Sequence, residues 1–177
     1  MRQLCLAPSR VQSSLCFVTH HPPILESRHL HWPDEADCAA FAHRLARQPG
    51  VGNAVIELRG PLGAGKTTLV RHLLRALGVT GRIKSPTYAV LEPYVLADGG
   101  SASHLDFYRF ADPREWLDAG LREVYAAPGL KLAEWPDNAG PYLPTPDLRL
   151  HITPGITDES RDVGVDALSP LGLALLG

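Results

Sequence analysis

The alternation of polar and apolar positions predicts two helices in the first half of this chain. Both stretches place apolar residues three and four positions apart, as on one face of a helix. The first begins after Asp34, an N-cap residue, and ends at Pro49-Gly50, whereas the second ends at Gly78, where a glycine commonly closes a helix. Their apolar positions are Cys38, Phe41, Ala42 and Leu45 in the first helix, and Leu69, Val70, Leu73, Leu74 and Leu77 in the second.

Short apolar or alternating runs predict strands along most of the remaining chain. Residues 113–125 are expected to form helical turns, and residues 171–176 a short apolar tail. Helices alternate with strands early in the chain, and strands dominate late. We therefore expect a single α/β domain with a mostly parallel central sheet and antiparallel additions. The predicted strands are residues 28–32, 53–58, 88–96, 102–108, 129–135, 147–153 and 161–167.

Composition narrows the class of protein. Of 177 residues, 45% are hydrophobic and 20% charged, a balance that excludes disorder throughout and a coiled coil. The net charge of −2 argues against a protein that coats nucleic acid. No apolar run approaches the roughly 18 residues of a membrane span, so no membrane association is expected. The three cysteines form no C-x-x-C pair, which indicates reduced thiols and a cytoplasmic location.

The first 27 residues differ from the rest of the chain. Residues 1–25 contain no acidic side chain, and their apolar run at 15–18 is too short for a signal peptide. A transit peptide fits this composition loosely. We expect a disordered extension over residues 1–27, or a start codon placed too far upstream, followed by one folded domain over residues 28–177. A chain starting at Arg28 is therefore predicted to keep its stability.

The motif with the most specific chemistry is GPLGAGKT at residues 60–67, which fits G-x-x-x-x-G-K-[ST], the P-loop. Glycines let the backbone curl closely around phosphate oxygens, and the helix that opens at Lys66 adds its positive dipole end. Lys66 would reach the β- and γ-phosphates, and Thr67 would hold Mg²⁺. The motif predicts a P-loop NTPase-like fold. The residues expected to cradle the nucleotide are Gly60, Leu62, Gly63, Ala64, Gly65, Lys66, Thr67 and Thr68.

A P-loop also needs a carboxylate for its metal, usually at the end of a neighbouring strand. Asp106 and Glu134 each end an apolar run and are the two candidates. The N-K-x-D motif that guanine specificity would require does not occur in the sequence. ATP is therefore the expected nucleotide, and ATP and Mg²⁺ are the expected cofactors.

Four motifs in order resemble one known family. The P-loop is followed by KSPTY at 84–88, HLDFYR at 104–109 and EWP at 134–136. In order and spacing these are similar to the TsaE (YjeE) family, from about residue 28 to the C-terminus. The resemblance implies a small bacterial P-loop ATPase needed to make the threonylcarbamoyladenosine modification of tRNA.

The resemblance also implies roles for individual residues. The Ser85-Pro86-Thr87 segment would form a switch-like loop near the γ-phosphate. Asp106 would be the Walker-B-like carboxylate, and Glu134 would lie by the metal and the attacking water. One departure is Pro61, where the family often has an acidic residue, and the long N-terminal extension is a second. The expected catalytic residues are Glu134, Lys66 and Thr87, and the expected metal ligands are Thr67, Asp106 and Glu134.

The function that these observations favour is slow, Mg²⁺-dependent ATP hydrolysis. By resemblance, the protein would dock on the TsaD–TsaB transferase pair and reset it between turnovers, meeting tRNA only through that complex. Two alternatives stay open: a small-molecule kinase, and a non-catalytic module that senses nucleotide. His104 and Trp135 can equally be structural, and Tyr108 and Arg109 can be a surface pair.

Overall fold

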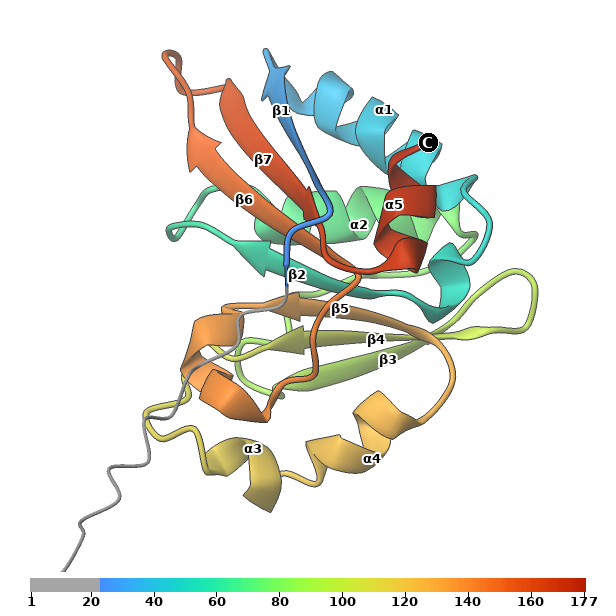
Figure 1. Ribbon diagram of the computed structural model, residues 1–177, viewed down its shortest axis with the longest axis vertical. Helices are drawn as coiled ribbons and strands as arrows, with labels where there is room; N and C mark the ends of the chain where they lie inside the picture. The colour runs from blue at the N-terminus through green and yellow to red at the C-terminus, as the bar shows by residue number, and fades with distance from the viewer. Residues whose placement is uncertain (1–22) are drawn as a thin grey trace, which may run out of the picture.

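Seven strands form one mixed sheet in the computed structural model, which describes residues 23–177 (Figure 1). They are β1 (Glu26–Trp32), β2 (Val55–Arg59), β3 (Leu91–Val95), β4 (Ser101–Asp106), β5 (Leu130–Glu134), β6 (Leu148–Pro154) and β7 (Arg161–Ala167). Their order across the sheet is β1-β7-β6-β2-β5-β4-β3. The four central strands β6, β2, β5 and β4 run parallel, whereas β3 at one edge and β7 and β1 at the other are antiparallel additions. The predicted fold class is confirmed.

Helices lie on both faces of this sheet (Figure 1). The first face is covered by α1 (Glu35–Ala46), α2 (Lys66–Ala76) and the C-terminal α5 (Pro170–Leu176). The second face carries the short helices α3 (Glu115–Asp118) and α4 (Leu121–Ala126) and the 3₁₀ segment η2 (Pro136–Tyr142). A further 3₁₀ turn, η1 (Val51–Asn53), leads into β2.

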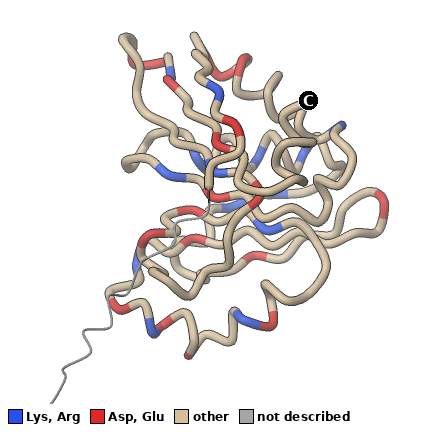
Figure 2. The backbone as a smooth tube through the Cα atoms, in the orientation of Figure 1, with Lys and Arg blue, Asp and Glu red and all other residues tan. Residues whose placement is uncertain are grey.

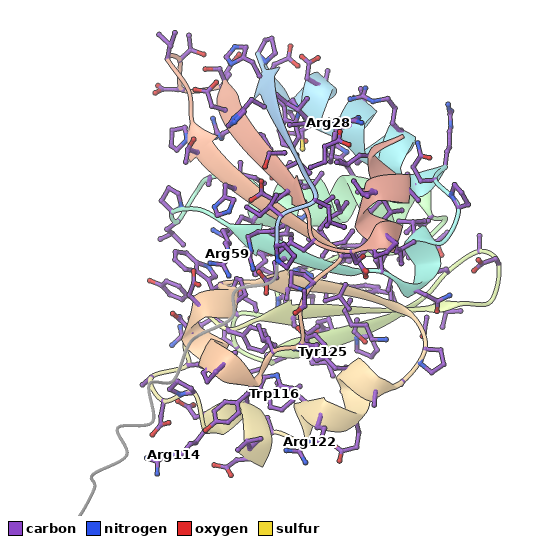
Figure 3. All side chains as sticks on the ribbon, in the orientation of Figure 1. Arg28, Arg59, Arg114, Trp116, Arg122 and Tyr125 are labelled. Atoms are coloured by element: carbon purple, nitrogen blue, oxygen red, sulfur yellow. The ribbon has the colours of Figure 1, made fainter. Side chains whose placement is uncertain are left out.

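The alternation of side chains along each strand separates two cores. Even-numbered strand residues such as Ile56, Leu132 and Leu150 pack with α1 and α2 in the larger core. A smaller core on the second face contains Leu105 and Phe107, and Trp116 and Tyr125 reach it from α3 and α4 (Figure 3). The second face is not uniformly apolar, because Glu57 of β2, Lys131 of β5 and Arg149 of β6 alternate with the residues of the larger core.

Both predicted helices form, and their ends follow from local chemistry. Asp34 caps α1, because its Oδ1 accepts hydrogen bonds from the backbone N–H groups of Ala36 and Asp37, at 2.7 and 3.4 Å. The apolar positions predicted for α2 are buried, with the exception of Leu77, which is partly buried after the end of the helix.

Two elements differ from the sequence-based prediction. The expected tail at 171–176 is helix α5, which Ser169 caps by accepting from the Gly172 N–H at 3.0 Å. The strand expected over 88–96 begins only at Leu91, because Val90 has a positive φ of 65° that breaks the extended backbone. The helical turns expected over 113–125 are confirmed as two short helices separated at Gly120, whose φ is 67°.

The ordered sheet begins before Arg28. Strand β1 starts at Glu26, and the Leu25 N–H already donates to the Ala167 carbonyl at 2.8 Å. The domain boundary expected at residue 28 therefore falls inside β1. Residues 1–22, most of the predicted extension, lie outside the described residues. Within residues 23–177, no helix is long and apolar enough to cross a membrane.

Candidate nucleotide-binding site

The glycine-rich loop, residues 60–67, connects the end of β2 to the start of α2. Gly60 has a φ of 136°, and a β-carbon there would lie 2.0 Å from the Ile152 carbonyl oxygen. Gly65 has a φ of 101° and precedes α2 without any side-chain cap, so the first N–H groups of the helix have no side-chain partner. The loop thus presents backbone donors at a helix N-terminus, the arrangement that binds anions in proteins.

Lys66 is folded back onto this loop. Its Nζ donates to the carbonyl oxygens of Gly60 at 2.9 Å and Pro61 at 2.8 Å, and lies 4.1 Å from the centroid of the Trp135 ring. Burial lowers the pKa of Lys66, and the nearby carboxylates of Glu134 and Asp106 oppose that shift. The ammonium group therefore lies between the loop and two acidic side chains, with only backbone oxygens and an aromatic face as partners.

The two candidate carboxylates lie side by side at the carboxyl ends of parallel strands. Asp106 ends β4, Glu134 ends β5, and the two residues are partners in the β4–β5 register. Each is 3% exposed. In open α/β sheets, ligands bind outside the carboxyl ends of the strands, which is where the glycine-rich loop also lies.

Glu134 is held by side chains of two other elements. Its Oε1 accepts from the Thr67 hydroxyl of α2 at 2.8 Å and lies 2.9 Å from Nε2 of His104 on β4. His104 is fully buried. This carboxylate is therefore tied to the helix and to the sheet at once.

Asp106 is held instead by a loop. Its Oδ2 accepts from the Thr87 hydroxyl at 2.7 Å and from the Ser85 hydroxyl at 3.2 Å, and its Oδ1 accepts from the Tyr108 N–H at 2.9 Å. The Ser85 and Thr87 hydroxyls lie 2.8 Å apart. The Ser85-Pro86-Thr87 segment, which the sequence predicted as a switch-like loop, is thus hydrogen-bonded to Asp106.

A cavity of about 230 Å³ unites these groups. Every residue predicted to bind nucleotide or metal or to act in catalysis lines it except Gly60, whose carbonyl accepts from Lys66. Pro61 supplies a carbonyl in the same way, so the departure from the family pattern leaves the loop closed around Lys66. The lining residues are Leu62, Gly63, Ala64, Gly65, Lys66, Thr67, Thr68, Ser85, Thr87, Asp106, Tyr108, Glu134 and Trp135.

A second cavity of about 520 Å³ adjoins the first along Ala64, Gly65 and Thr68. Sequence reasoning missed it, because it joins α1, the glycine-rich loop and the turn before β7, which are far apart in the chain. Arg161 at the start of β7 lines it, and its Nε donates to the Ala64 carbonyl at 2.9 Å. Arg161 belongs to no local sequence motif. It reaches the glycine-rich loop because the strand order places β7 next to β6. The other lining residues include Trp32, Asp34, Glu35, Cys38, Asp158 and Glu159.

The oxygens of this site suit a Mg²⁺ ion shared with a phosphate. Thr67, Asp106 and Glu134 offer a hydroxyl and two carboxylates, the hard ligands that Mg²⁺ prefers. Within residues 23–177, no group of three or more His, Cys, Asp or Glu side chains is placed to hold a metal by itself. Mg²⁺ is usually bound through one or two carboxylates together with water and substrate phosphates.

Comparisons with known proteins agree on one family. The family model of threonylcarbamoyl adenosine biosynthesis protein TsaE matches residues 32–163. The tRNA threonylcarbamoyladenosine biosynthesis protein TsaE of Haemophilus influenzae is 35% identical over 152 residues, which cover 84% of this chain and 94% of the relative. The protein of the same name from Streptomyces coelicolor is 35% identical over 133 residues, 75% of this chain and 89% of the relative.

A solved structure has the same fold. The crystal structure of Bacillus subtilis YdiB superposes with a TM-score of 0.70 at 25% identity, covering 85% of this chain and 92% of that one. From the family match, the relatives and this fold, the chain belongs to the TsaE family of threonylcarbamoyl adenosine biosynthesis proteins.

Proposed function

We propose that this protein is a slow, Mg²⁺-dependent ATPase that serves the threonylcarbamoyladenosine modification of tRNA. One observation carries the proposal: a single cavity joins the glycine-rich loop, Lys66 and the two strand-end carboxylates Asp106 and Glu134. Phosphoryl transfer depends chiefly on positioning and on stabilising charge, and these are the groups that provide both.

The glycine-rich loop would bind the phosphates. Its free N–H groups and the N-terminus of α2 would meet the phosphate oxygens. Lys66 would exchange its two backbone carbonyl partners for phosphate oxygens, a change that replaces weak neutral acceptors by charged ones. Binding should therefore draw the ammonium group away from Gly60 and Pro61.

The two carboxylates would divide the remaining work. Thr67, Asp106 and Glu134 would hold Mg²⁺ directly or through its water, and the ion would neutralise charge on the phosphates. Glu134, fixed by two hydrogen bonds, would also orient the attacking water and accept its proton. The Thr87 hydroxyl, which donates to Asp106, would shift when the γ-phosphate is bound or lost, and Asp106 would shift with it.

The nucleoside would occupy the adjoining cavity of about 520 Å³. This cavity begins where the phosphate cradle ends, at Gly65 and Thr68, and Trp32 supplies an aromatic surface. ATP is preferred over GTP because the chain lacks the N-K-x-D motif. We place this activity in the cytoplasm, where a free buried thiol such as Cys38 stays reduced.

The partner proposed is the TsaD–TsaB complex. Exposed side chains lie in the cavity lining or next to it in sequence: Leu62 lines the cavity and is 75% exposed, and Tyr88, which follows Thr87, is 85% exposed with the Arg109 guanidinium 4.1 Å above its ring. Such side chains are typical of protein interfaces. A partner seated there would sense whether the loops hold a γ-phosphate.

Contact with tRNA is proposed to be indirect. Positive and negative residues are interspersed along the described chain (Figure 2). A nucleic-acid surface usually gathers its positive charge on one face. The threonylcarbamoyl transfer itself is assigned to the partner complex.

The arginines do not favour the kinase alternative. A kinase lid would bring several arginines over the phosphates, but Arg114 and Arg122 point outward from the region of α3 and α4 (Figure 3). Arg114 is paired with Asp112 at 2.6 Å, and Arg109 stacks on Tyr88.

The decisive experiment combines capture with phosphate release. Purified TsaD and TsaB should retain this protein with ATP bound, and phosphate release should rise when the complex is present. Tyr88→Ser should weaken capture, whereas Val95→Ser should not, because Val95 is also exposed but lies at the other end of β3. No association with or without ATP would refute the proposed partner, and no phosphate release in the complex would leave only a nucleotide sensor.

A further inference from the structure

His104 is a buried histidine inside the sheet, two residues before Asp106. It is fully buried on β4 and lies on the same face of the strand as Asp106. Its Nε2 is 2.9 Å from Oε1 of Glu134, which is itself 3% exposed. The hydrogen-bond partner of this buried ring is therefore a carboxylate that lines the phosphate cavity.

The contact fixes which ring nitrogen carries the proton. A carboxylate oxygen can only accept, so Nε2 must donate. The other nitrogen, Nδ1, is buried and has no hydrogen-bond partner among the described residues. A proton on Nδ1 would be a buried donor without an acceptor, which costs free energy. The tautomer with its proton on Nε2 is therefore the one that fits this place.

The hydrogen bond completes the support of one oxygen of Glu134. Oε1 receives both available donors, the Thr67 hydroxyl and the His104 ring, from two different elements. Oε2 receives no hydrogen bond from the described residues, although Glu134 lines the cavity. Two donors at one oxygen, with β5 holding the backbone, fix the torsions of the side chain and leave the second oxygen for chemistry.

We infer that His104 is a positioning residue for Glu134: its Nε2–H anchors Oε1, so that Oε2 stays free to act on the water or the metal. The inference rests on the proposed function, and it assigns His104 no contact with nucleotide. It requires the donor at Nε2 and not merely the volume of the ring.

Two matched substitutions separate this role from packing. In His104→Gln the side-chain amide can place an N–H near the former Nε2, whereas in His104→Asn it can reach only the position of Nδ1, where no partner lies. In single turnovers with the TsaD–TsaB complex, we expect His104→Asn to lose about 10- to 100-fold in rate, the scale of a misplaced catalytic group. His104→Gln should restore most of that rate. ATP affinity should change little in either variant.

Thermal unfolding of both variants controls for packing. A purely structural histidine predicts that rate follows stability, with the smaller Asn and the larger Gln losing activity in proportion to their loss of melting temperature. Equal rates in the two variants at comparable stability would overturn the inference.

A second measurement needs no activity. In the full-length chain labelled with ¹⁵N, the ring of His104, assigned by its absence from His104→Gln, should carry its proton on Nε2 and none on Nδ1. That proton should be protected from exchange with water, and Glu134→Ala should remove the protection. A proton on Nδ1 would overturn the inference whatever the ATPase assay gives. If the wild-type complex releases no phosphate, the proposed function fails, and the ring spectrum alone then decides whether His104 holds Glu134.

Discussion

The two carboxylates of the site are equally buried but are held by different parts of the molecule. Glu134 is tied to the scaffold, because its two partners lie on α2 and on the central strand β4. Asp106 is tied to a loop, because its side-chain partners Ser85 and Thr87 precede β3 and Ser85 is exposed. Asp106 and Glu134 are paired across β4 and β5, but different elements hold them. Moving the Ser85–Thr87 loop would release Asp106, whereas releasing Glu134 would require α2 or β4 to move.

This difference separates a fixed half of the site from an adjustable one. The loop that holds Asp106 ends in Val90, a β-branched residue with a φ of 65°, and the Asp106 N–H donates to the Val90 carbonyl at 3.0 Å. A β-branched residue in the left-handed region is strained, so the surrounding contacts must maintain it. We expect the Glu134 side to be ready before nucleotide arrives and the Asp106 side to rearrange with it.

The largest effect should come from the fixed half. Glu134→Gln should leave ATP binding nearly unchanged and reduce hydrolysis by about 10²–10⁴-fold, as for loss of a general base. A group that acts only in the transition state changes rate without a matching loss of affinity. Paired measurements of nucleotide affinity and single-turnover hydrolysis check this. If affinity falls as far as the rate, Glu134 serves mainly to bind the metal.

Lys66 lies near both Glu134 and Asp106, and Lys131 provides a matched control for its substitution. Lys66→Met should reduce nucleotide affinity or hydrolysis by about 10²–10³-fold, because it removes a charged donor from a loop built for anions. Lys131→Met removes another lysine that is 4% exposed and whose Nζ donates to the Gly129 carbonyl, on the opposite face of the sheet. Fluorescent-nucleotide titration should find Lys131→Met unaffected. Normal binding by Lys66→Met would remove the glycine-rich loop from the proposed site.

The adjustable half predicts a different signature. Asp106→Asn should weaken Mg²⁺-dependent nucleotide binding and hydrolysis together, by about 10- to 100-fold, because a partner of the metal or its water is lost. Binding measured without Mg²⁺ should hardly change. Titrating Mg²⁺ at fixed nucleotide tests this, and an effect on hydrolysis alone would mean that the roles of Asp106 and Glu134 are exchanged.

Thr87 tests the loop itself. Thr87→Ala leaves one oxygen of Asp106 with only the longer Ser85 contact, and it should slow hydrolysis in the partner complex by about tenfold, the scale of one hydrogen bond to a charged group. Thr87→Ser keeps the hydroxyl and should behave like the wild type. A uniform effect of both changes would point to the methyl group and to packing instead.

Local patterns predicted the elements of the fold, whereas contacts between distant segments escaped them. The glycine-rich loop, Asp106 and Glu134 were accessible because each belongs to a short motif with its own chemistry. The antiparallel β7 lies beside β6, and that order brings Arg161 to the Ala64 carbonyl, which no local pattern encodes. The role of His104 was left open because its partner is 30 residues away.

The smallest effect is predicted at the edge of the sheet farthest in strand order from β4. A chain starting at Arg28 loses Glu26 and Ser27 from β1, and with them the Ser27 hydroxyl bond to Asp166 at 2.6 Å and the pairing with Ala167. A few such exposed bonds are worth about 1–2 kcal/mol in total, because each exchanges with water. The melting temperature should fall by about 2–8 °C, given roughly 2–4 °C per kcal/mol for a domain of this size.

A chain starting at Pro23 keeps all of β1 and should melt like the full-length protein. Nucleotide affinity and hydrolysis should be the same in both truncated chains, because Glu26 and Ser27 lie at the opposite end of β1 from Trp32, which lines the proposed nucleoside cavity. Calorimetry and phosphate release on the same samples give the answer. A loss of activity that exceeds the loss of folded protein would mean that the start of β1 supports the site, and not only its end at Trp32.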